Sequence, residues 1–229
     1  LVMFSFLIFE VINLGTSVLC SQYLGAKLHN KVVQVVGVSL LLNVIIGLSV
    51  SAILYFGAPF LLHLMGLRES LMVYGISYME IVGAFAFFQA VSLTISASLK
   101  SADKAIYPMM VVVVVNVLNI IGNYSLIFGR FGMPALGVDG AAISTVFARG
   151  VSMVILIIIL FKKHIPRFPL ANFRPFPWIE MKNLLKIGLP SAGENMSYSF
   201  SQVVLTYFIN MIGDEALATL QDLNKVLDN

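Results

Sequence analysis

The sequence predicts an all-α protein, a polytopic membrane helix bundle, and three observations predict it. Of the 229 residues, 59% are hydrophobic and 11% are charged, whereas a soluble domain carries about 25% charged residues. Six apolar stretches reach the roughly 17–25 residues that a helix needs to cross the bilayer core. Polar residues inside these stretches recur at helical spacing. So few charges exclude a water-facing surface, and the net charge of +3 is not clustered as a nucleic-acid-binding face requires.

Each predicted transmembrane helix corresponds to one apolar stretch, and the six cover residues 1–24, 33–56, 72–99, 107–128, 136–161 and 187–212. The segment 162–186 differs from the short turns elsewhere because it contains Pro166, Pro169, Pro175 and Pro177. Proline interrupts a long helix, so we predict a linker here. Residues 213–229 form a polar tail.

The orientation of the helices follows from the distribution of Lys and Arg. Ten of these residues fall in the loops 25–32, 100–106 and 162–186, and only Arg68 and Arg130 fall in the loops on the other side. Cytoplasmic loops are enriched in Lys and Arg, so we place the three basic loops in the cytoplasm. The first residue then lies outside, and we expect one further helix upstream.

The stretch VVVVVNVLNIIGNY at 111–124 carries three asparagines within an apolar run. At 100° per residue, Asn116, Asn119 and Asn123 fall within about 60° of one helix face, whereas a strand would divide them between two faces. This spacing predicts a helix with a polar face. Two roles remain open for that face, the lining of a cavity and hydrogen bonding between helices.

Four of the predicted helices have a polar face, and three of these four carry a carboxylate. Glu10 shares a face with Asn13, Ser17 and Ser21, and Glu194 lies near Tyr198 and Gln202. A carboxylate facing lipid costs at least a few kcal/mol, so these groups should face a cavity or each other. Desolvation favours the neutral acid and a bound cation favours the charged form. We therefore predict Glu194 and Glu10 as sites of cation or proton coupling.

Glu80 has an alternative role, an ion pair with Arg149, which is the one base well inside a predicted span. Enzyme signatures such as H-E-x-x-H, G-x-S-x-G and the P-loop are missing from the sequence. The three histidines are scattered and lie at or beyond the span ends, and the one cysteine, Cys20, cannot form an internal disulfide. We predict no enzymatic activity, no metal site and no cofactor.

Four stretches together resemble the multidrug and toxic compound extrusion (MATE) family of transporters: SQYLGAK at 21–27, NVLNIIGNYSLIFG at 116–129, FGMPALGVDGAAISTVFAR at 131–149 and LLKIGLPSAGENMSYSFSQ at 184–202. The resemblance implies a twelve-helix protein of two six-helix lobes, of which this chain holds helices two to seven. Residues 1–161 would then be an incomplete N-terminal lobe of five helices. Residues 162–186 would be the cytoplasmic interlobe linker, and 187–212 the first helix of the C-terminal lobe.

The resemblance also implies a function, the efflux of cationic or amphipathic organic compounds against H⁺ or Na⁺ by alternating access. The expected location is the cell membrane, and the expected partners are the bilayer, small organic substrates and the remainder of the transporter. The substrate cavity would be lined by Asn116, Asn119, Asn123, Tyr198 and Gln202. The family's first-lobe coupling aspartate lies on helix one, which is not in this chain.

Two alternatives to efflux stay open. One is a lipid-linked oligosaccharide flippase of the same superfamily, whose cavity should hold several bases for pyrophosphate, whereas Arg149 is the sole deep base here. The other is an inactive fragment of a transporter.

Overall fold

The structure, a computed structural model, describes residues 2–64, 69–164 and 176–212, and all regular structure in these ranges is helical. The predicted polar tail and residues 165–175 of the predicted linker lie outside the described residues. The elements are α1 (Val2–Gly25), α2 (His29–Phe56), α3 (Ala58–Leu64), α4 (Glu69–Ala84), α5 (Ala86–Ser101), α6 (Ile106–Phe128), α7 (Val138–Ile159), the π-helical turn η1 (Leu160–His164) and α8 (Trp178–Ile212). The predicted all-α class is confirmed.

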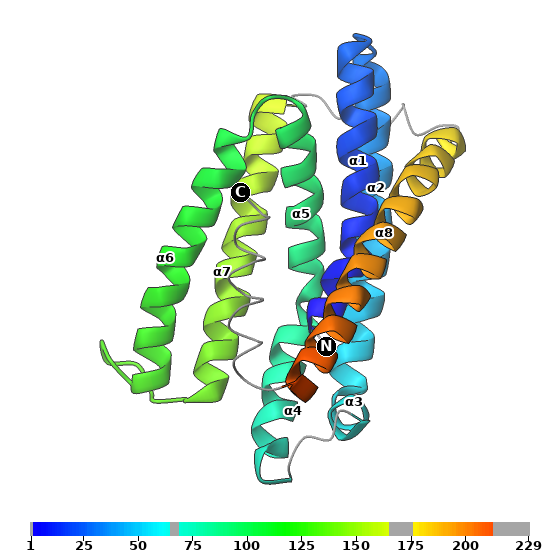
Figure 1. Ribbon diagram of the computed structural model, residues 1–229. Coiled ribbons are helices and arrows are strands. Elements are labelled where there is room, and N and C mark those ends of the chain that lie inside the picture. Colours follow the sequence, from blue (N-terminus) through cyan, green and yellow to red (C-terminus); the bar gives the residue numbers. More distant parts are fainter. Residues whose placement is uncertain (1, 65–68, 165–175, 213–229) are drawn as a thin grey trace. The chain divides into compact units, whose positions relative to one another are not determined.

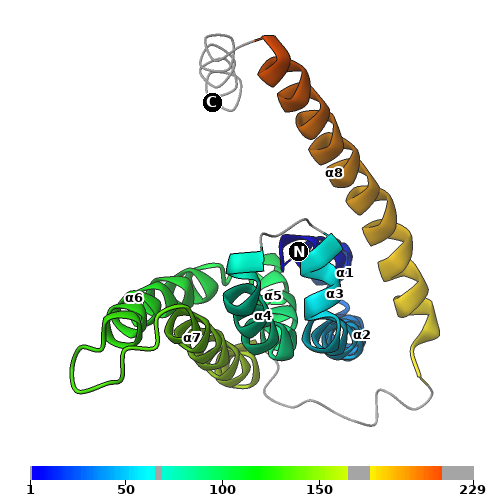
Figure 2. The same cartoon turned by 90° about the horizontal axis from the view of Figure 1, so that it is seen from below.

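The chain divides into two compact units, Leu1–Gly188 and Leu189–Asn229. In the first unit, α5 packs against α1 and α2 on one side and against α7 on the other, and α6 packs mainly on α7 (Figures 1 and 2). Its main apolar cluster combines α1, α2, α5, α7 and the first turns of α8, and includes Val35, Val36, Ile95, Leu99, Leu156 and Leu184. A second cluster forms around Phe9, Leu54 and Met79.

The predicted span 72–99 is not one straight helix. It is divided between α4 and α5, which meet at Phe85 with a bend of 45°. The backbone N–H of Phe87 donates to the hydroxyl of Ser51 in α2, at 3.3 Å, and so leaves the helical hydrogen-bond pattern. Beside it, Gly83 lies so close to α2 that a Cβ there would be 2.6 Å from Leu54 Cβ. Helix α2 therefore stabilises the bend. Neither α4 nor α5 contains a proline, so the sequence contains no local signal for a bend.

Among the described residues, three helices are long and apolar enough to cross a membrane: His29–Phe56, Ile106–Phe128 and Val138–Lys162. The bent pair α4–α5 makes a fourth if it is counted as one span. The stretches predicted at 1–24 and 187–212 form the helices α1 and the greater part of α8, and their crossing of the membrane stays a prediction.

Helix α8 begins at Trp178, well before the predicted span at 187. Its first turns belong to the first unit, where Leu184 is buried in the main apolar cluster. A Cβ added to Gly15 of α1 would lie 2.5 Å from the carbonyl oxygen of Leu184, so α1 and α8 pack with almost no space between their backbones. Residues 178–186, predicted as part of a linker because of the four prolines, are helical, since the prolines all precede the helix.

Candidate functional site

Two of the three predicted asparagines of α6 meet α7 in a polar cluster. The Asn123 amide Nδ2 donates to Asn119 Oδ1 at 2.8 Å, and Asn119 Nδ2 donates to Thr145 Oγ1 of α7 at 3.4 Å. The Ser144 hydroxyl of α7 donates to the backbone carbonyl of Asn119 at 3.2 Å. Gly122 lies directly against Ser144, and its missing side chain lets the two helices approach this closely. We call Asn119, Asn123 and Thr145 the amide cluster.

The amide cluster has unused acceptor capacity. Asn123 Oδ1 is buried and has no hydrogen-bond partner in the described part of the chain. The Thr145 hydroxyl donates to the carbonyl of Ala141 in its own helix at 2.9 Å, so its proton is not available to Asn123. A buried amide oxygen without a donor is unfavourable unless water, a cation or a ligand donor reaches it. The cluster is therefore suited to bind a small polar or cationic species.

Asn116 is separate from this cluster, because its side chain is exposed on α6 one turn away. The spacing of the three asparagines predicted a shared face, and the structure brings two of them together with Thr145. Thr145 was missed, because a lone threonine on a helix is more often a local hydrogen-bonding residue. The contact between α6 and α7 distinguishes Thr145 from such a local hydrogen-bonding threonine.

The predicted coupling carboxylates lie in different settings. Glu10 is half-buried on α1, whereas Glu194 is exposed on α8 in the second unit. On the same helix, Gln202 Nε2 donates to the Tyr198 hydroxyl at 3.1 Å, which places these two predicted cavity residues on one face. The roles of all four residues stay predictions.

The predicted ion pair between Glu80 and Arg149 also stays a prediction. The two residues stand on α4 and α7, which pack against each other. Both side chains are half-buried, and Tyr78 of α4 interacts electrostatically with Arg149. The α4–α7 contact contains a further polar pair, in which the Ser77 hydroxyl donates to Asp139 Oδ1 at 2.5 Å.

A salt bridge that was not predicted from the sequence joins the start of α8 to the basic end of the first unit. Lys31 Nζ of α2 lies 3.3 Å from Glu180 Oε1, and the Tyr23 hydroxyl of α1 donates to Glu180 Oε2 at 2.5 Å. Glu180 is only 4% exposed. A position in a linker implied a solvated carboxylate, so no pattern in the sequence suggested a partner for Glu180.

The largest cavity described in the first unit, about 530 Å³, lies apart from the amide cluster. It opens between α5, α6 and α7, and its polar lining is Gln89, Ser92, Ser96, Lys100 and Ser152. Near it, Phe85, Phe87 and Phe88 form an aromatic cluster, with 4.6 Å between the ring centroids of Phe87 and Phe88. The first unit thus offers a polar cluster and a separate cavity, both bordered by α6 and α7.

Apolar helices of membrane-spanning length that hold amides, hydroxyls and carboxylates between them define a polytopic membrane protein of the transporter class. The MatE family model matches residues 1–125, more than half of the chain. The chain belongs to the MatE family, and the predicted resemblance is confirmed. Because members of this family are transporters, the prediction that the chain is not an enzyme is also confirmed.

Similar curated proteins agree with this family. The chain is 42% identical over 219 residues to the uncharacterized transporter YisQ of Bacillus subtilis. This match covers 96% of this chain and 47% of YisQ. It is 33% identical over 142 residues to a probable multidrug resistance protein NorM of Thermotoga maritima, covering 62% and 30% of the two chains. It is 28% identical over 211 residues to the multidrug export protein MepA of Staphylococcus saprophyticus, covering 92% and 46%. The chain spans about half the length of the curated relatives it matches.

Solved structures show the same fold. A crystal structure of MATE in the bent conformation matches with a TM-score of 0.83 at 23% identity, over 96% of this chain and 48% of that one. An inward-facing MATE family transporter of the MOP superfamily matches with a TM-score of 0.74 at 24% identity, over 84% and 43%. The chain is thus a multi-pass membrane protein with the MATE fold.

Proposed function

We propose that this chain supplies five helices of the first lobe and the first helix of the second lobe of a secondary active exporter. The exporter would move small organic compounds, chiefly cationic ones, out of the cell against an inward flow of H⁺ or Na⁺. Relatives named as multidrug resistance and export proteins support this proposal. The single observation that carries it is the amide cluster, with its buried, unpartnered Asn123 oxygen inside a membrane helix pair.

In this proposal the amide cluster receives the coupling cation or the water that carries a proton. Amide and hydroxyl oxygens are hard ligands of the kind that bind small cations. The position of the cluster between α6 and α7 would tie its occupancy to the packing of this helix pair. A site that binds the ion only in one packing arrangement shifts the population of the two arrangements by its differential affinity.

Glu194, with the bonded pair Tyr198 and Gln202 one and two turns further along α8, forms the proposed substrate contact. An anionic carboxylate attracts a cationic substrate, and an aromatic ring beside it adds a cation–π contact worth about 0.5–2 kcal/mol. The hydrogen bond from Gln202 restricts the Tyr198 ring. The carboxylate would be neutralised either by the substrate or by a proton, and this competition is the exchange that an antiporter needs.

The test uses a chimera in which this chain replaces the 219 residues that it matches in YisQ. In proteoliposomes with an imposed proton or sodium gradient, we expect the chimera to export a cationic dye. Glu194→Gln should lower the rate at least tenfold with equal protein abundance, because the neutral amide no longer exchanges a proton for the dye. Glu194→Asp should retain part of the rate.

A matched control is Ser49→Ala, which removes an exposed hydroxyl that is bonded within α2 and should leave export unchanged. Equal export by the chimera and by Glu194→Gln would remove Glu194 from the mechanism. The same assay on the 229-residue chain separates the activity of the whole transporter from what this chain does alone.

A further inference from the structure

Three buried polar atoms between α1, α2 and α5 have no hydrogen-bond partner among the described residues. They are both amide atoms of Asn13 and Oδ1 of Asn43. Asn13 is 5% exposed, and Asn43 is fully buried. Buried polar atoms in proteins are nearly always bonded to protein or to internal water. Hydrogen bonding between the described helices does not account for these three atoms.

Bonded polar side chains lie between the unpartnered ones and form a continuous set. The Thr16 hydroxyl of α1 is hydrogen-bonded to that of Ser39 in α2 at 2.6 Å. Asn43 Nδ2 donates to the Thr94 hydroxyl of α5. Further along, the Cys20 thiol lies beside Ser98 and Ser101 of α5. We call these residues and the unpartnered ones the polar file; its members are Asn13, Thr16, Cys20, Ser39, Asn43, Thr94, Ser98 and Ser101.

The polar file runs along the helix axes. Asn13, Thr16 and Cys20 fall within about 60° of one face of α1, and steps of three or four residues separate them by about 4.5–6 Å. Ser98 and Ser101 are one turn apart at the end of α5. The direction of the file is from the middle of α1 toward the end of the unit that carries Lys27, Lys31, Lys100 and Lys104.

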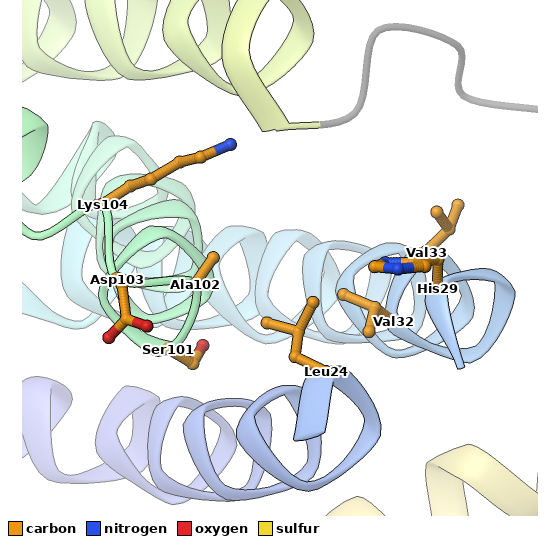
Figure 3. Close-up of a pocket in the computed structure, with 8 residues that line it drawn as sticks. All are labelled: Leu24, His29, Val32, Val33, Ser101, Ala102, Asp103 and Lys104. Carbon is orange, nitrogen blue, oxygen red and sulfur yellow. The ribbon is translucent and has the colours of Figure 1, made fainter. Parts of the chain in front are cut away.

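At that end the file reaches a cavity of about 380 Å³ (Figure 3). Ser101 belongs to both the file and the cavity lining. Figure 3 shows Leu24 from α1, His29, Val32 and Val33 from α2, and Ala102, Asp103 and Lys104 after α5 around the same space. A cavity of this size holds several water molecules. The end of the polar file at Ser101 therefore lies next to a space that can hold water.

The geometry points to a file of internal water molecules that runs from this cavity along the α1–α2–α5 interface to Asn13. Each unpartnered atom then gains the bond that the described residues do not supply. The amide of Asn13 both donates and accepts, so it suits the inner end of such a file. The hydroxyls of Thr16, Thr94 and Ser101 donate to backbone carbonyls of their own helices and offer water their acceptor capacity.

The file ends one helical turn from Glu10, which is half-buried on α1. Resting on the proposed function, we assign the water file as the path by which Glu10 exchanges its proton with the cytoplasm. The proton leaves the Glu10 carboxyl for the nearest water, each water accepts one proton and passes one on, and a carboxylate remains. The titratable groups along the path are Glu10, Cys20, and the cavity residues His29, Asp103 and Lys104.

The water file is tested without reference to transport. The 229-residue chain in lipid nanodiscs is exposed to brief X-ray pulses in ¹⁸O-labelled water, and side-chain oxidation is measured by mass spectrometry. Cys20 is fully buried, so it reports water inside the file. Met79 is the matched control, because it is a sulfur side chain, 3% exposed, in the apolar cluster around Phe9 and Leu54.

We expect Cys20 to take up ¹⁸O at least five times faster than Met79. Ser98→Ala should slow the labelling of Cys20 at least twofold, because Ser98 lies beside Cys20 at the cavity end of the file. Ser125→Ala, which removes a buried hydroxyl bonded within α6, should not slow it. Equal rates for Cys20 and Met79, or a Cys20 rate unchanged in Ser98→Ala, would overturn the water file.

The proton path is tested in the YisQ chimera. Ser98→Ala should lower proton-driven dye export at least threefold without changing dye affinity, because it slows proton delivery and leaves the substrate site intact. If Ser98→Ala slows Cys20 labelling but leaves export unchanged, the proton path is overturned and the water file still stands. If the unmodified chimera exports no dye, the proposed function fails, and the labelling result for the water file still stands.

Discussion

Glu180 shows how a single side chain determines where α8 begins to pack. Its buried carboxylate pairs with the ammonium of Lys31, whose side chain is about half exposed, and accepts a hydrogen bond from the hydroxyl of Tyr23. The Lys31 ammonium also lies 5.2 Å from the centre of the Tyr23 ring. A buried charge is unfavourable without its partner, so these three residues should behave as one unit.

The coupling within this unit predicts an order of stability. Lys31→Met should lower the free energy of unfolding by about 1–3 kcal/mol, because it leaves the Glu180 carboxylate buried without its cation. The double variant Lys31→Met/Glu180→Gln should be more stable than Lys31→Met alone, since the neutral amide still accepts from Tyr23. Thermal melting of purified protein in detergent measures both.

Lys100→Met is the control, because Lys100 is an exposed lysine at the same end of the unit. Equal melting temperatures for Lys31→Met and Lys100→Met would contradict a buried salt bridge. A double variant less stable than Lys31→Met would mean that Glu180 contributes by itself.

The predictable part of the site follows from spacing within one helix. Asn119 and Asn123 could be placed together because four residues separate them, and the structure joins them. Thr145 and Glu180 could not be found in this way, because their partners lie on other helices, 26 and 157 residues away. Contacts at such separations depend on packing, which one sequence does not reveal.

Close backbone contact between α1 and α8 depends on glycine. A Cβ at Gly15 would lie 2.5 Å from the Leu184 carbonyl oxygen, and Gly188 lies just as tightly against Val11. Small residues at such crossings are a common means of packing membrane helices, because they bring the backbones into van der Waals contact.

Gly15→Ala should therefore destabilise the protein by about 1–3 kcal/mol, the usual cost of overpacking. Gly25→Ala is the matched control on the same helix, since a Cβ added there would meet no atom within 4 Å, and it should be neutral or slightly stabilising. Both are measured by thermal melting in detergent. Equal melting temperatures would contradict the close contact between α1 and α8.

Helices were more predictable than the breaks between them. The apolar stretches at 107–128 and 136–161 match α6 and α7 to within about two residues, because composition and length alone define them. The bend at Phe85 depends instead on Ser51, which is 36 residues away from Phe87 and accepts its N–H. A local pattern cannot show that a neighbouring helix has taken over a hydrogen bond.

At the scale of the molecule, α6 is the least covered of the three described helices that are long and apolar enough to cross a membrane. Its buried residues are Pro108, Val111 and Ser125, on the side that meets α7 and α5. Val113, Val117 and Ile120 are among the apolar side chains that remain exposed. Such a surface is stable against lipid or against further protein, which agrees with a multi-pass membrane protein.

The orientation of the whole chain can be measured. An impermeant maleimide added to intact cells should label Met133→Cys, in the exposed loop after α6, and should label Lys27→Cys only after permeabilisation, because the lysine-rich loops are predicted to be cytoplasmic. Cys20 is buried and should stay unlabelled throughout. The reverse pattern would invert the predicted topology.

Helix α8 runs without interruption from Trp178 to Ile212 and passes the border between the two units at Gly188. Pro190 removes one backbone hydrogen bond to the carbonyl of Lys186 but does not end the helix. Within the second unit, Glu194, Tyr198 and Gln202 follow one another at steps of four residues, and the last two are hydrogen-bonded. Loss or gain of one residue between Glu194 and Tyr198 would turn the carboxylate by about 100° relative to this bonded pair. A loop absorbs such a change in length, but a helix converts it into rotation.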